Sequence, residues 1–213
     1  MMLRDVLWIL LGYLSGSVLF ARLWGSVLGR DVTARAEDRN PRAANAFIQG
    51  GFFMGVMTLV GDVLKGAIPV ALYVQGLQEM PGLIPMALVL AAPVCGHVWP
   101  CWYGFRGGKG IAATFGCLLG LLPLTPRPFA ILACCFIGLS CVVRVSPNYH
   151  RTLIAYAAAL VLMAVRGVFP GVALGFLLMT GMMAYRMHVS PEARPQCRFS
   201  LPWLPGTLRK RSS

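Results

Sequence analysis

A glycine-rich basic segment offers the clearest chemistry in the sequence. Residues 105–110 read Phe-Arg-Gly-Gly-Lys-Gly and run directly into an apolar segment. Glycines let a backbone approach a ligand closely and turn its N–H groups toward it. A helix that starts there adds the positive end of its dipole, and two basic side chains add full charges. We therefore predict an anion site suited to phosphate, with a flexible basic turn as the alternative. The residues assigned to it are Arg106, Gly107, Gly108, Lys109 and Gly110.

Two ionisable residues lie inside an otherwise apolar run. Asp62 and Lys65 are three positions apart, so they share one face of a helix and can pair. An ionisable residue at membrane depth is costly and is a functional hypothesis by default. Two interpretations stay open: a mutually neutralised structural pair, or Lys65 facing a polar substrate cavity. Pro69, one turn on, is expected to kink the helix and free backbone carbonyls.

Three further polar residues flank these segments. His97 precedes a proline break at Pro100 and the basic segment, so it is either a hydrogen-bonded packing residue or a functional one. Asn40 and Asn45 lie in a loop of mixed charge. Their amides can donate to phosphate oxygens or cap the next helix.

The composition indicates which elements must position these residues. Of 213 residues only 12% are charged and 57% are hydrophobic, and the mean hydropathy is +0.70. These values exclude a disordered chain and argue against an ordinary soluble domain. The net charge of +12 would suggest nucleic acid in a soluble protein. Here the basic residues lie between apolar runs, so we predict a polytopic all-α membrane protein without a nucleic-acid partner.

Seven apolar segments are candidates for membrane spans, and the fourth is short enough to be half-embedded. Their approximate ranges are 6–28, 52–75, 83–103, 110–125, 128–145, 152–166 and 168–186. With the N-terminus outside, 14 of the 19 Lys and Arg residues fall on the cytoplasmic side and 3 outside. We predict one membrane-embedded domain over 1–213, a cytoplasmic C-terminus and an irregular tail from about residue 190. The seven Cys and three His show no disulfide framework and no metal-ligand spacing.

These motifs together resemble the PlsY family of bacterial acyl-phosphate:glycerol-3-phosphate acyltransferases. The similarity covers nearly the whole chain and is strongest over Gly-His-x-Trp-Pro at 96–100 and Phe-x-Gly-Gly-Lys-Gly-Ile-Ala at 105–112. Asp-x-x-Lys-Gly-x-x-Pro at 62–69 and Gly-Tyr-Leu-x-Gly-Ser at 12–17 also match. Seven spans with the N-terminus outside is the topology of that family.

The resemblance implies transfer of an acyl chain from an acyl phosphate to the 1-hydroxyl of glycerol 3-phosphate, giving lysophosphatidic acid for phospholipid synthesis. It implies a site at the cytoplasmic face of the bacterial cell membrane, and no cofactor. The implied catalytic residues are Lys109, His97 and Ser17. The implied substrate-binding residues are Asn40, Asn45, Lys65, Arg106, Gly107, Gly108, Gly110, Ser146 and Arg186.

The first loop departs from the family pattern. Glu37, Asp38 and Arg39 stand where typical members have Gly-Ser-Gly. Two carboxylates at that place would repel phosphate. Two alternatives therefore stay open beside the acyltransferase: a PlsY-like protein without activity that binds lipid or a partner, or a small transporter of a phosphorylated solute.

Overall fold

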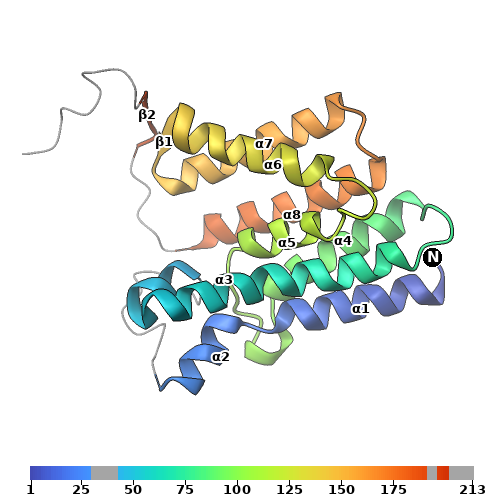
Figure 1. The fold of residues 1–213 in the computed structure, drawn as a ribbon, viewed down its shortest axis with the longest axis horizontal. Helices are drawn as coiled ribbons and strands as arrows, with labels where there is room; N and C mark the ends of the chain where they lie inside the picture. Colours follow the sequence, from blue (N-terminus) through green and yellow to red (C-terminus); the bar gives the residue numbers. More distant parts are fainter. Residues whose placement is uncertain (30–42, 191–195, 202–213) are drawn as a thin grey trace, which may run out of the picture.

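The fold is a bundle of helices lying side by side along one long axis (Figure 1). The structure, a computed structural model, describes residues 1–29, 43–190 and 196–201. Its helices are α1 (Leu3–Ser17), α2 (Phe20–Val27), α3 (Ala43–Gln75), α4 (Leu83–Val98), α5 (Ile111–Leu119), α6 (Arg127–Ile137), α7 (Asn148–Val165) and α8 (Pro170–Val189). A 3₁₀ turn (Cys101–Tyr103), a π-helical turn (Gly138–Val142) and two strands, β1 (Arg144–Ser146) and β2 (Arg198–Ser200), complete it. Helices α6 and α7 form one side of the bundle, and α1 and α2 form the other.

Helix length and composition identify fewer membrane spans than the seven predicted. Three described helical stretches are long and apolar enough to cross a membrane, namely Gly50–Gln75, Leu83–Tyr103 and Pro170–Val189. A fourth follows if the bent pair α1–α2 counts as one span. The predicted span 110–125 contains only the nine residues of α5, which rise about 14 Å against a hydrocarbon core of about 30 Å. The count of seven is therefore not confirmed by helix length.

An apolar core runs through the middle of the bundle. The rings of Tyr156 and Phe176 stack with centroids 5.4 Å apart, and Leu90 and Leu118 are fully buried beside them. Large apolar side chains also cover much of the outer surface, for example Val161 on α7, which is 62% exposed. An apolar exterior around an apolar core is what a lipid solvent permits and water does not.

The predicted span over 6–28 is not one continuous helix, because the chain breaks between α1 and α2. Val18 and Leu19 adopt extended backbone angles, and the two helices meet at 44°. Neither residue is a glycine or proline, so nothing local requires the break. The Val18 carbonyl at the break accepts a hydrogen bond from Lys65 on α3.

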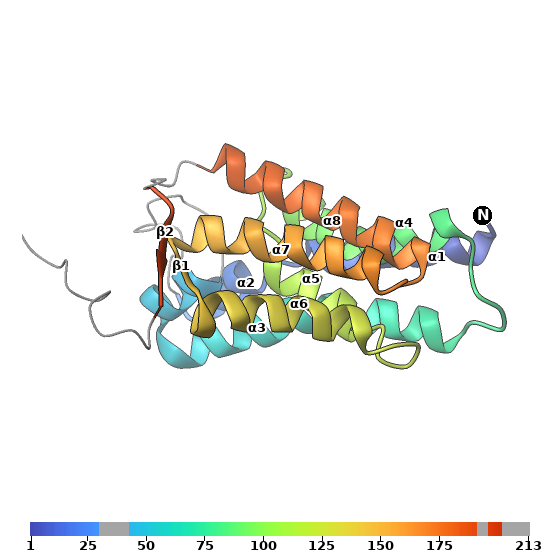
Figure 2. The ribbon, with the colours of Figure 1, turned by 90° about the horizontal axis from the view of Figure 1, so that it is seen from above.

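The described part of the tail contains a strand where irregular structure was predicted. Residues 198–200 form β2, which pairs antiparallel with β1 and sets Val145 opposite Phe199. Figure 2 shows this pair at the end of the bundle where α7 begins, with the N-terminus at the opposite end. Val145 is buried, so an aromatic and a β-branched side chain hold the two short strands together.

Close packing of α1 against α4 depends on small residues. A Cβ at Gly16 would overlap the carbonyl oxygen of Pro93, and a Cβ at Gly96 would overlap the carbonyl oxygen of Tyr13. Backbone meets backbone at this contact, and any side chain would force the helices apart. The contact brings the end of α4 against the break between α1 and α2.

We expect Gly16→Ala to lower the unfolding temperature of the purified protein, because the added methyl group separates α1 from α4 at a cost of about 1–3 kcal/mol. Gly181→Ala is the matched control, since Gly181 is also helical and nothing lies within 4 Å of its added Cβ. It should leave the unfolding temperature unchanged or raise it. Equal unfolding temperatures for both variants would contradict the packing described here.

Candidate functional site

A buried ammonium group joins three elements at the centre of the site. Lys65 Nζ, on α3, lies 2.8 Å from Asp62 Oδ1 as an ion pair and donates a 2.8 Å hydrogen bond to the Val18 carbonyl. It also lies 2.6 Å from His97 Nδ1 on α4. Asp62, Lys65 and His97 are each no more than 4% exposed. The predicted pairing of Asp62 with Lys65 is confirmed, and the ammonium has three acceptor atoms within 2.8 Å.

This arrangement decides how His97 is oriented. An ammonium has no acceptor, so His97 Nδ1 accepts and the ring proton lies on Nε2. Nε2 faces the glycine-rich segment, because a Cβ at Gly108 would overlap it. His97 therefore links Lys65 to the backbone of that segment.

Pro69 acts on the same cluster through the backbone. It lacks the N–H that would bond to the Lys65 carbonyl one turn back, and Ser15 Oγ donates to that carbonyl at 2.9 Å instead. The freed carbonyl predicted from Pro69 is thus confirmed. The non-helical residue inside α3 is Gly51, with φ 81°, rather than a residue beside Pro69.

The glycine-rich segment folds back onto the end of α4. Gly107 N donates to the Val98 carbonyl and Gly108 N donates to the His97 carbonyl, each at 3.1 Å. A Cβ at Gly107 would overlap the His97 carbonyl oxygen. The expectation that these two N–H groups point at an anion is therefore wrong, because they satisfy the last carbonyls of α4. The segment from Gly107 to Gly110 is buried.

The N-terminus of α5 supplies the backbone donors that remain. Gly110 has φ 80°, a conformation that suits glycine, and α5 starts at the next residue. Its first intrahelical bond runs from Thr114 N to the Gly110 carbonyl, at 2.8 Å. The N–H groups of 111–113 precede that bond, so they are the orphan donors of a helix start. They and the helix dipole favour an anion there.

Four cationic side chains gather on residues 103–109. Arg186, from α8, donates to the Gly107 carbonyl through Nη2 at 2.8 Å and Nε at 3.2 Å. Arg22, from α2, lies over the Tyr103 ring at 5.2 Å. Lys109 is 6% exposed, while Arg106 is exposed. Two helices that are distant in sequence thus add positive charge to a segment that already carries two cations.

Ser17 lies beside the site but is enclosed. Its Oγ donates to the Tyr13 carbonyl at 2.9 Å and accepts from Cys101 N at 3.4 Å, and the residue is 0% exposed. Tyr13 in turn donates to the Trp99 carbonyl at 2.8 Å. These bonds tie α1 to the turn that follows α4.

The remaining predicted site residues lie away from the Lys65 cluster or outside the described residues. Ser146 is exposed in β1, where it pairs with Arg198. Asn40 lies outside the described residues, as do Glu37, Asp38 and Arg39. Asn45 lies in the first turn of α3, and its side chain is outside the described part.

Sequence reasoning did not assign two contributors. Arg22 fell inside a predicted span, and a lone cation in an apolar run is itself a signal that was available. The Val18 carbonyl has no such signal, because a backbone acceptor is freed only by the break between α1 and α2.

Comparisons with known proteins agree on one family. The family model described as glycerol-3-phosphate acyltransferase matches residues 6–193. A glycerol-3-phosphate acyltransferase of Neisseria meningitidis serogroup C is 39% identical over 122 residues, which are 56% of this chain and 60% of that protein. One from Pseudomonas paraeruginosa is 40% identical over 120 residues, 55% of this chain and 62% of that protein. The alignments thus span less than two thirds of these relatives.

Solved structures share the fold. The crystal structure of PlsY, an integral membrane glycerol 3-phosphate acyltransferase, in its glycerol 3-phosphate form has a TM-score of 0.74 at 22% identity, covering 86% of this chain and 88% of that one. Its lysophosphatidic acid form has a TM-score of 0.73 at 24% identity, covering 85% and 87%. Since the family model spans most of the sequence, the chain belongs to the glycerol-3-phosphate acyltransferase family.

Proposed function

We propose that this protein is a membrane acyltransferase that moves a fatty acyl group from acyl phosphate to the 1-hydroxyl of glycerol 3-phosphate, producing lysophosphatidic acid and phosphate. Family membership supports the reaction class. The observation that carries the proposal is the gathering of Lys109, Arg186, Arg22 and Arg106 on residues 103–109, beside the N-terminus of α5. Both substrates carry phosphate, so each needs such a cationic site.

The proposed reaction requires the protein mainly to position the two substrates and to supply positive charge near the phosphate. The glycerol hydroxyl oxygen bonds to the acyl carbon, and the bond from that carbon to the phosphate oxygen breaks. The leaving phosphate takes the electron pair, and the hydroxyl proton passes to phosphate or solvent. Because an acyl phosphate is already activated, no covalent enzyme intermediate is needed. Positive groups fixed near the leaving phosphate lower the barrier without reorganising.

The described contacts support a division of roles. We assign Lys109, Arg186 and the N–H groups at the start of α5 to the substrate phosphates, with Arg106 and Gly110 as their neighbours. Lys65, His97 and Ser17 are buried and occupied, which supports positioning roles for them. Gly107 and Gly108 would serve by letting the segment lie against His97.

The proposed setting is the bacterial cell membrane, with one domain and the site facing the cytoplasm. The distribution of Lys and Arg supports an outside N-terminus and a cytoplasmic C-terminus. Seven crossings would require α5, α6 and α7 to count as spans beside the four longer stretches. Short spans of this kind are tolerated when neighbouring helices bury them or the bilayer thins.

Purified protein in detergent, given palmitoyl phosphate and labelled glycerol 3-phosphate, should form lysophosphatidate. Lys109→Ala should lower kcat by about 10²–10³, since it removes a fixed charge beside the leaving phosphate. Arg144→Ala, which removes an exposed cation from β1, should leave kcat near the original value. No product from the unaltered protein would favour the inactive lipid- or partner-binding alternative, and phosphorylated-solute flux into liposomes would favour the transporter.

Gly108→Ala should lower kcat at least tenfold, because the new methyl group collides with His97 Nε2 and displaces the segment that carries Lys109. His97→Ala removes the ring and makes room for that methyl group. The two effects should therefore be strongly non-additive, with the double variant less impaired than the product of the single losses predicts. Independent, multiplicative losses would contradict the contact, and Gly138→Ala, which has open space, serves as the control.

Lys65→Met alone should destabilise the folded protein by about 3–5 kcal/mol, because it leaves the Asp62 carboxylate buried without its partner. Asp62→Leu combined with Lys65→Met removes both charges and should recover most of that loss. Thermal unfolding of the three purified proteins checks this order. A double variant less stable than Lys65→Met would contradict the explanation that the unpaired Asp62 carboxylate causes the loss of stability.

A further inference from the structure

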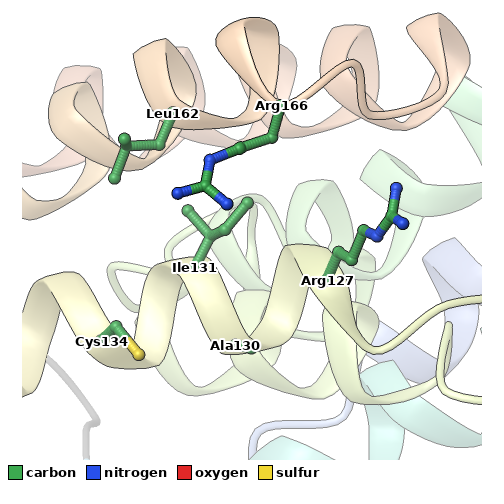
Figure 3. A pocket seen from close by; sticks show the side chains of 6 residues that line it. All are labelled: Arg127, Ala130, Ile131, Cys134, Leu162 and Arg166. Atoms are coloured by element: carbon green, nitrogen blue, oxygen red, sulfur yellow. The ribbon is translucent and has the colours of Figure 1, made fainter.

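A groove lies between α6 and α7, on the side of the bundle away from α1 and α2 (Figure 3). Its volume is about 520 Å³. It is lined by Arg127, Ala130, Ile131, Cys134, Leu162 and Arg166. No residue assigned to the glycine-rich site borders it.

Two cationic side chains line the groove. Arg127 begins α6 at one end of it, and Arg166, which directly follows α7, extends its guanidinium back over Ile131 (Figure 3). Within the described residues, neither guanidinium makes an ion pair or hydrogen bond. Arg4, at the same end of the bundle, is by contrast engaged, since it donates to the Gly76 carbonyl and lies beside Asp5.

The rest of the groove is apolar. Ala130, Ile131 and Cys134 follow Arg127 along α6, and Leu162 lies one turn before Arg166 on α7. From Arg127 to Cys134 the helix rises about 10 Å, and Cys134 and Leu162 lie beyond the Arg166 guanidinium (Figure 3). The groove is therefore cationic from its Arg127 end to Ile131 and apolar beyond, which suits an amphiphile with an anionic head group.

We propose that this groove binds an anionic phospholipid of the bilayer, with the phosphate between Arg127 and Arg166 and an acyl chain along Ile131, Cys134 and Leu162. Charge complementarity selects the head, because unpaired guanidiniums between apolar helices are a binding site for lipid phosphate. The apolar floor selects a lipid over free phosphate, which has nothing to place there.

The proposed lipid site is separate from the glycine-rich site. The glycine-rich segment precedes α5, whereas Arg127 follows α5, at the end of the bundle that holds the N-terminus (Figure 1). The lipid bound here is thus expected to belong to the other leaflet and to stabilise the α6–α7 side rather than to react.

Photo-crosslinking of the full chain tests this proposal. The protein is reconstituted in phosphatidylcholine vesicles with phosphatidylglycerol that carries a diazirine in one acyl chain. We expect labelling to centre on peptides that contain Ile131, Cys134 and Leu162, and to be competed by unlabelled phosphatidylglycerol. Titration of Arg127→Gln/Arg166→Gln should show an affinity about thirty-fold weaker, since each basic residue contributes about fivefold.

Two further variants make the result specific. Arg144→Gln/Arg198→Gln removes two exposed cations from the strand pair at the other end and should change the affinity less than twofold. Cys134→Trp keeps both arginines but fills the groove, and should lower labelling of Leu162 about tenfold. Unchanged unfolding temperatures would show that each variant is folded.

Three results would overturn the proposal: equal labelling by a phosphatidylcholine probe, labelling spread evenly over the other outer helices, or full competition by inorganic phosphate. Efficient Cys134-to-Cys134 cross-linking between copies would also overturn it, because a second copy would then occupy the groove.

Discussion

The structure depends on the neutralisation of one buried positive charge. Lys65 carries an ammonium group into an apolar bundle, where an unpaired charge would cost several kcal/mol. Its three partners come from its own helix, from the break between α1 and α2, and from α4. Because satisfying the charge requires all three, it fixes how these elements meet. The break at Val18 leaves a backbone carbonyl outside any helix, and this carbonyl is one of the three partners.

This cluster is connected to the proposed site by contacts of short range. His97 joins Lys65 on one side and the glycine-rich segment on the other, and the end of α4 accepts hydrogen bonds from Gly107 and Gly108. Arg186 then holds the Gly107 carbonyl from α8. The buried polar groups thus act as a frame, while Lys109 and the start of α5 carry the positive field. These contacts fix the position of the segment relative to three helices without any ligand.

Local patterns predicted the parts of this arrangement that depend on neighbouring residues. The spacing of Asp62 and Lys65 predicted their pairing, Pro69 predicted a freed carbonyl, and the apolar runs predicted a helical membrane protein. The contact between Lys65 and the Val18 carbonyl could not be predicted, because that carbonyl is available only where the chain breaks between α1 and α2. The N–H groups of Gly107 and Gly108 were wrongly assigned to an anion for a similar reason. They donate to the last carbonyls of α4, and this contact depends on how the segment folds back, which local sequence does not reveal. Strand β2 likewise needs a partner more than 50 residues away.

We infer that the Lys65 cluster organises the glycine-rich segment for phosphate binding as well as stabilising the fold. The decisive measurement is equilibrium binding of labelled glycerol 3-phosphate to the folded variant Asp62→Leu/Lys65→Met, with the unaltered protein as reference. Binding to the variant should be at least about tenfold weaker, because His97 loses its partner and no longer fixes the segment. Binding at the affinity of the unaltered protein would contradict it and leave the cluster a purely structural feature.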